Sequence, residues 1–180
     1  MTDRPYPEQY VRPGRMKNSE PILFRPIRPD DEPLMIKFHQ ALSDRTVYMR
    51  YFQSLKLSQR TSHERLSRIC SIDFDREMVL VAEHENATGD PEIVAVGRLS
   101  RLPDPNQAEM AVLVDDHFQH QGLGTELYRR LLEVARQEKL TAVESTVLAE
   151  NREMLAICRK LDFDLKADFK DGTVQATLNL

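Results

Sequence analysis

Residues 110–139 constrain the fold more than any other part of the chain. Residues 110–114 form an apolar run typical of a strand, and residues 125–139 have the periodicity of a helix. The turn between them, residues 119–124, contains two glycines. The first amides of a helix lack intrahelical partners and carry partial positive charge, and glycine lets a backbone approach a phosphate closely. The segment predicts either an anion site or a turn that needs glycine only for its geometry.

Length and charge limit the partners of the chain. With 180 residues, the chain has the size of one domain with its own core. The formal net charge is −4, so we expect neither nucleic acid nor a membrane surface as a partner. No apolar run approaches the roughly 18 residues that a membrane span needs, and the N-terminus lacks the apolar core of a signal peptide.

The cysteines and histidines predict no metal site. Cys70 and Cys158 lie far apart in the sequence and have no metal-type spacing, so we interpret them as free thiols in a reducing cytoplasm. His117 and His120 are three residues apart, but no third ligand lies in phase with them. We therefore expect a cytoplasmic protein without a bound metal ion.

The two ends of the chain differ in their patterns. Residues 1–20 are rich in proline and have little apolar periodicity, which predicts a flexible N-terminal arm. Residues 21–180 are expected to form the folded domain. It begins with a strand at 22–27, and the following residues, up to about 70, contain three short amphipathic helices with acidic or hydroxyl caps.

The remaining elements predict a mixed sheet. Three strands joined by turns indicate an antiparallel meander, and a strand–helix–strand unit after it indicates a right-handed parallel crossover. We expect strands at 78–82, 93–99, 108–114 and 141–148, helices at 125–139 and 151–161, and a final hairpin of 163–169 with 174–180. The predicted fold class is α/β (α+β), with a mostly antiparallel sheet of about seven strands and helices on both faces.

The glycine turn and its surroundings resemble the GNAT superfamily of acyl-CoA-dependent N-acyltransferases. Gln119, Gly122 and Gly124 match the superfamily's loop motif, and Val114 lies five residues before Gln119, where the family ends its central strand. Asn151 opens the next helix, as the family's asparagine often does. The order of elements after the N-terminal arm also matches. The resemblance implies the GNAT fold and acetyl-CoA as co-substrate.

A narrower resemblance is to bacterial Pat-type protein lysine acetyltransferases. Four segments carry it, namely residues 27–34, 48–52, 63–66 and 72–77. In many proteins of that type, the GNAT domain is joined to an acyl-CoA-synthetase-like or cyclic-nucleotide-binding domain. The resemblance implies a protein lysine as the acceptor amine, such as one on an acyl-CoA synthetase. The sequence leaves a homodimer open.

The GNAT resemblance also assigns the cofactor contacts. The turn's backbone amides are expected to hold the CoA pyrophosphate, and the preceding strand is expected to pair with the pantetheine arm. The expected cofactor-binding residues are Val112, Leu113, Val114, Gln119, His120, Gln121, Gly122, Leu123, Gly124, Thr125 and Asn151.

Glu109 is the candidate general base. An amine with a pKa near 10.4 is mostly protonated at neutral pH, so a group must accept its proton. Glu109 lies on the strand that would meet the thioester, in phase with Ala111 and Leu113. Pat-type enzymes resemble this chain in having a glutamate there. The alternative is a surface carboxylate matched by a nearby arginine.

Cys158 marks a departure from the family pattern. Many GNAT enzymes carry at this position a tyrosine that protonates the leaving thiolate. Here either the thiolate leaves without such an acid, or Cys158 or a water supplies the proton. The alternative for Cys158 is a buried helix thiol.

The sequence as a whole predicts an acetyl-CoA-dependent N-acetyltransferase that works by direct transfer in a ternary complex. A protein lysine is the favoured acceptor. One alternative is an acetyltransferase for small amines or protein N-termini, and another is a non-catalytic module that senses acyl-CoA. A sensor needs the glycine turn but no base, so Glu109 separates these alternatives.

Overall fold

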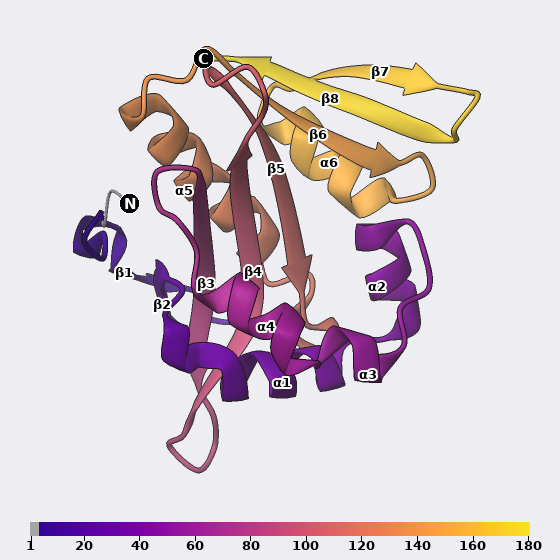
Figure 1. Ribbon diagram of the computed structural model, residues 1–180. Coiled ribbons are helices and arrows are strands. Elements are labelled where there is room, and N and C mark those ends of the chain that lie inside the picture. Colours follow the sequence, from indigo (N-terminus) through magenta and orange to yellow (C-terminus); the bar gives the residue numbers. More distant parts are fainter. Residues whose placement is uncertain (1–3) are drawn as a thin grey trace.

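A single mixed sheet organises the protein, as the computed structural model of residues 4–180 shows (Figure 1). The sheet has the strand order β1-β2-β3-β4-β5-β6-β8-β7. β5 and β6 run parallel, whereas the other neighbouring strands are antiparallel. The strands are β1 (Arg12–Arg15), β2 (Pro21–Pro26), β3 (Glu77–Glu85), β4 (Pro91–Arg101), β5 (Gln107–Val114), β6 (Ala142–Leu148), β7 (Asp164–Asp168) and β8 (Thr173–Asn179).

Helices cover both faces of the sheet, which confirms the predicted fold class (Figure 1). One face carries the N-terminal helices, and α5 and α6 lie on the other. The helices are α1 (Glu32–Ala41), α2 (Asp44–Tyr51), α3 (Leu57–Arg60), α4 (His63–Cys70), α5 (Leu123–Gln137) and α6 (Arg152–Lys160). Short 3-10 turns occur at Glu8–Tyr10, Pro29–Asp31 and Asp116–Phe118.

The alternation of side chains along β5 links the two halves of the core. Met110 points into the cluster that packs beneath α5, and Leu113 belongs to the cluster formed with α1, α2 and α4. Odd and even positions of a strand face opposite sides of its sheet. Glu109 therefore lies on the side of the N-terminal helices, whereas Val112 and Val114 lie on the side of α5.

The N-terminal segment differs from the expected flexible arm. β1 pairs with β2, and Tyr10 and Met16 are only 6% and 4% exposed. The Tyr10 hydroxyl also donates a 2.7 Å hydrogen bond to Gln137 on α5. Pro13 is compatible with this strand because β1 lies at the sheet edge, where a missing N–H costs little. Residues 1–3 of the predicted arm lie outside the described residues.

The pairing of β5 and β6 is short. Only residues 107–109 of β5 are in register with residues 142–144 of β6. Beyond Glu109 the two strands part, as the diverging arrows of β5 and β6 show (Figure 1). The parting leaves the inner edge of residues 110–114 without a neighbouring strand. An unpaired strand edge of this kind can take an extended ligand as an additional strand.

No helix in the described residues is long and apolar enough to cross a lipid bilayer.

Candidate active site

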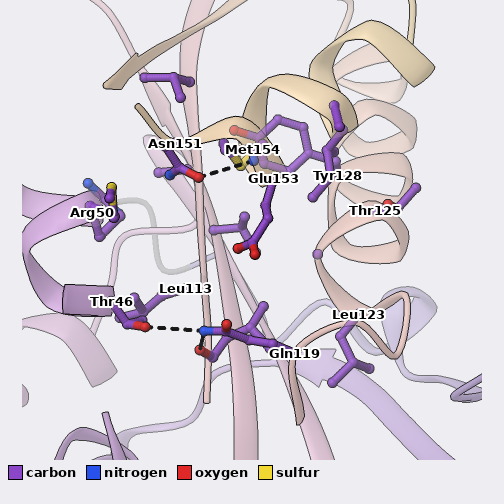
Figure 2. A pocket seen from close by; sticks show the side chains of 18 of the residues that line it. Thr46, Arg50, Leu113, Gln119, Leu123, Thr125, Tyr128, Asn151, Glu153 and Met154 are labelled. Carbon is purple, nitrogen blue, oxygen red and sulfur yellow. Dashed lines mark hydrogen bonds between the residues drawn. The ribbon is translucent and has the colours of Figure 1, made fainter. Parts of the chain in front are cut away.

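A cavity of about 980 Å³ lies where β5 and β6 separate. Its walls come from the end of β5, the residues around the starts of α5 and α6, and the helix α2 (Figure 2). The cavity contains residues from both ends of the predicted site, namely Glu109 and Asn151, together with most of the glycine turn. Segments that are far apart in the sequence thus share one open pocket.

Two buried hydroxyls form a network beside the pocket, and one of them belongs to Tyr128, which lines it. Ser145 Oγ donates a 2.8 Å hydrogen bond to the carbonyl oxygen of Met110, the first residue of β5 beyond the paired segment. Tyr128 Oη lies 2.8 Å from Ser145 Oγ and 3.3 Å from the same carbonyl. Burial raises the pKa of Tyr128, and its hydrogen bond to Ser145 opposes the rise. The network satisfies a carbonyl that loses its strand partner when β6 departs.

The glycine turn presents a row of free amides. None of the backbone N–H groups of residues 119–125 donates a hydrogen bond within the described chain. Gly122 has a φ of 86°, a conformation that glycine adopts without steric cost. His120 also has a positive φ, of 63°, which is uncommon for a residue with a side chain. Together with the start of α5, these amides form a site suited to an anion.

Gly124 permits close packing at the start of α5. A Cβ atom at this position would lie 3.0 Å from Ile157 Cδ1 on α6 and 3.9 Å from Val114 on β5. A distance of 3.0 Å is shorter than an ordinary van der Waals contact, so a larger residue would require the Ile157 side chain to shift. Gly124 therefore sets how near the first turn of α5 lies to the cavity.

The side chain of Gln119 has a structural role, because its hydrogen bonds are to other residues of the protein. Its Nε2 donates hydrogen bonds of 3.2 Å to the Val114 carbonyl and to Thr46 Oγ1 on α2 (Figure 2). Thr46 Oγ1 in turn donates a 2.7 Å hydrogen bond to Asp116. Gln119 thereby ties the end of β5 to α2, and its backbone amide is the part that is free to meet a ligand.

Asn151 also has a structural role. Its Oδ1 accepts a 3.1 Å hydrogen bond from the Met154 amide and caps α6 (Figure 2). The residue lines the cavity, so the remaining amide group of its side chain is available to a ligand. The sequence places Asn151 correctly at the helix start, and the structure adds a reason for asparagine there that needs no cofactor.

Glu109 is an exposed carboxylate that lines the cavity. It is the last residue of β5 that is paired with β6, opposite Glu144, and on its other side it is paired with Ser100 of β4. Within residues 4–180, no arginine or other cation forms an ion pair with Glu109. The alternative of a carboxylate neutralised by a nearby arginine is therefore not what the structure shows. Its carboxylate is free to accept a proton or a hydrogen bond.

Cys158 is absent from the cavity lining, an arrangement that fits the buried helix thiol better than the proton donor. Its side chain is fully buried in the core beneath α5 and α6 and is absent from the cavity lining. Burial raises the pKa of the thiol to about 11. A thiol in this position has no route to a thiolate in the cavity. The structure places Cys158 among the packing residues of α6.

The sequence did not predict three residues that lie in or beside the pocket. Tyr128 falls within the apolar stripe of α5, where a hydroxyl is hidden by the hydrophobic periodicity. Ser145 is a single small residue in a β-branched strand, and Lys17 lies in the segment expected to be a flexible arm. Ser145 and Tyr128 are each 1% exposed in the structure. Their burial distinguishes them from other polar residues, but it could not be seen in the sequence.

The described residues contain no group of three or more histidine, cysteine, aspartate or glutamate side chains positioned to hold a metal ion.

Comparison with known proteins agrees with this geometry. The acetyltransferase (GNAT) domain family matches residues 22–164. A protein of Pseudomonas aeruginosa that is named an acetyltransferase is 31% identical over 153 residues, which is 84% of this chain and 80% of that protein.

Two solved structures extend the likeness to the fold. The GNAT domain of S. lividans PAT is 26% identical, with a TM-score of 0.86, over 98% of this chain and 100% of that domain. Mycobacterium smegmatis RimJ, solved in complex with CoA-disulfide, is 18% identical, with a TM-score of 0.73, over 94% of this chain and 86% of that protein. At that identity, the second likeness concerns the fold alone.

The match over residues 22–164 covers most of the chain, and the fold is similar to that of the GNAT domain of S. lividans PAT. The family uses acetyl-CoA as co-substrate. The chain belongs to the GNAT family of acetyltransferases and is an N-acyltransferase.

Proposed function

We propose that this protein transfers the acetyl group of acetyl-CoA directly to the side-chain amine of a protein lysine. One observation carries the proposal. The free carboxylate of Glu109 and the free amides of residues 119–125 border the same cavity, at the point where β5 and β6 part. The amides suit the cofactor, and the carboxylate suits the proton of the acceptor.

The cofactor is proposed to lie along β5. The amides of residues 119–125 would bind the pyrophosphate at the start of α5. The unpaired edge of Val112, Leu113 and Val114 would pair with the amides of the pantetheine arm as an additional strand. This placement brings the thioester to the parted strands near Met110, one residue beyond Glu109.

The reaction needs a base on the acceptor side. The acceptor ammonium gives one proton to Glu109, and the neutral amine attacks the thioester carbonyl carbon. The new N–C bond forms, the C–S bond breaks, and CoA leaves as a thiolate. A positioned general base contributes roughly 10²–10⁴-fold to such a rate. Because Cys158 is buried away from the cavity, water relays the second proton of the attacking nitrogen to the leaving thiolate, which yields the neutral amide and the CoA thiol.

Two observations favour a lysine acceptor. The segments that resemble Pat-type enzymes lie at residues 27–34, 48–52, 63–66 and 72–77, and the fold is similar to the GNAT domain of S. lividans PAT. In addition, the carboxylate of Glu109 lines the cavity without an ion-pair partner among residues 4–180 and would attract a cationic side chain. A lysine on an acyl-CoA synthetase is the proposed target, and acetylation would remove its charge. Two free cysteines support a reducing, cytoplasmic location.

A panel of acceptors tests the proposal. The protein is incubated with acetyl-CoA and, in separate reactions, with acyl-CoA synthetases, peptides that carry either a free lysine or a free N-terminus, and small polyamines. Release of the CoA thiol and mass spectrometry of the acceptor report the transfer. We expect acetyl groups on lysine side chains. Acetylation of N-termini or polyamines alone would replace the lysine proposal, and tight acetyl-CoA binding without thiol release would favour a sensor.

A further inference from the structure

The hairpin between β1 and β2 touches the glycine turn. The backbone amide of Lys17 donates a 3.1 Å hydrogen bond to the Gln121 carbonyl oxygen. The next amide, that of Asn18, donates a 3.1 Å hydrogen bond to Gln121 Oε1. A single residue of the turn is therefore held twice by a segment about 100 positions earlier in the chain.

The first of these hydrogen bonds fixes the direction of the Gly122 amide. A trans peptide is planar, so the C=O of one residue and the N–H of the next point in opposite directions. Since the Gln121 carbonyl points at the hairpin, the Gly122 N–H points away from it. This amide is one of those without a partner in the described chain, and Gly122 lines the cavity.

The hairpin is itself well anchored. Met16, directly before Lys17, is 4% exposed and packs into the core. Its amide bonds to the Glu20 carbonyl at 2.9 Å, and its carbonyl accepts a 2.9 Å hydrogen bond from Ser19. Lys17 thus begins a closed turn, and little backbone entropy remains to be lost when its side chain binds a ligand.

The Lys17 side chain extends over the turn and into the cavity lining. A Cβ atom on Gly122 would lie 3.7 Å from Lys17 Cε and 3.8 Å from Lys17 Cγ, so the aliphatic stem runs alongside the glycine. The residue is exposed, and no carboxylate within residues 4–180 forms an ion pair with its ammonium group. The positive charge stands beside a row of unpaired amides.

We propose that Lys17 is a cofactor-binding residue whose ammonium contacts the pyrophosphate of acetyl-CoA. The inference rests on the proposed function, because it takes acetyl-CoA as the ligand of the turn. The pyrophosphate is favoured over the 3′-phosphate because the stem of Lys17 lies against Gly122, in the middle of the amide row. The β1–β2 hairpin then acts as the third wall of the cofactor site, beside β5 and α5.

Calorimetric titration of the full chain with acetyl-CoA and with acetyl-dephospho-CoA tests this inference. The variants are Lys17→Met, Lys17→Arg and the control Lys166→Met, a lysine exposed on β7. We expect Lys17→Met to weaken both ligands by roughly 10-fold or more, the effect of losing one charge-assisted contact. Lys17→Arg should retain most of the affinity, and Lys166→Met should match the wild type. The melting temperature should stay unchanged in all three.

The possible outcomes distinguish a failure of the role of Lys17 from a failure of the proposed acetyl-CoA-dependent function. Lys17→Met that binds acetyl-CoA as tightly as the wild type overturns the role of Lys17. A loss seen with acetyl-CoA but absent with acetyl-dephospho-CoA moves the contact to the 3′-phosphate and overturns the pyrophosphate assignment. A wild-type chain that binds neither ligand refutes the proposed function, and the role of Lys17 with it.

Discussion

The Ser145 hydroxyl donates a 2.8 Å hydrogen bond to the Met110 carbonyl oxygen, across the point where β6 leaves β5. A carbonyl inside a sheet normally accepts from the neighbouring strand. Here the Ser145 side chain donates the hydrogen bond in place of a neighbouring strand, and the Tyr128 hydroxyl on α5 lies within hydrogen-bond distance of Ser145. Buried side chains of the folded core therefore brace the opening between the two strands.

Removing the Ser145 hydroxyl should destabilise the fold. In Ser145→Ala, the Met110 carbonyl keeps only the 3.3 Å contact with Tyr128, and the free energy of unfolding should fall by about 1–3 kcal/mol. Urea denaturation measures the change. Thr146→Ala, at the next and exposed position of β6, should cost less than ~0.5 kcal/mol. Equal losses in the two variants would show that the buried network adds nothing.

Alanine substitutions at the two glycines of the turn should impair the protein for different reasons. Gly124→Ala places a Cβ 3.0 Å from Ile157 Cδ1, so it should raise the KM for acetyl-CoA several-fold. Adding Ile157→Val removes that δ carbon and should restore the wild-type KM. Gly122→Ala strains a φ of 86° at a cost of about 1 kcal/mol, and Ile157→Val should not relieve it. Failure of the double variant to recover would disprove the packing explanation for Gly124.

Cys158 should be dispensable for chemistry. Because the thiol is buried with a pKa of about 11, Cys158→Ala should leave kcat within about twofold of the wild type. The lost packing should lower the free energy of unfolding by about 1 kcal/mol. Steady-state kinetics and denaturation, run on the same preparation, distinguish the two effects. A folded variant whose kcat falls 100-fold would reinstate Cys158 as the acid.

His39 should make stability depend on pH. It is 1% exposed in α1, and burial, followed by the charges of Arg65 and Arg60, lowers its pKa from 6.5 to about 4. Between those pH values the unfolded chain binds a proton that the folded chain does not, so stability falls as the pH drops from 6.5 to 4. The change from this residue is about 3 kcal/mol. Denaturation curves for His39→Gln should be flatter over this window, and curves parallel to the wild type would contradict the assignment.

Much of the fold could be predicted from the sequence because the local signals agree with the final packing. Asn151 is placed at a helix start by the sequence, and its side chain accepts the expected backbone hydrogen bond in the structure. The meander of β3, β4 and β5 follows from apolar runs separated by turns. The position of the pocket could be predicted because the glycine turn lies between the end of a strand and the start of a helix.

The remaining features depend on contacts between distant residues. β1 is proline-containing and short, and its evidence is the pairing with β2 and the burial of Tyr10. The helix α3 is four residues long, too short for any periodicity to indicate it. Neither of these two features leaves a local trace in the sequence.

Glu109→Gln tests whether this carboxylate is the general base. The amide keeps the size of the side chain but cannot take the acceptor's proton. With an acetylated acceptor identified, kcat should fall by 10² or more, whereas the Kd for acetyl-CoA, measured by calorimetry, should stay at the wild-type value. Glu150→Gln, which alters another carboxylate of the same cavity, should reduce kcat far less. Near-normal turnover by Glu109→Gln would contradict the account.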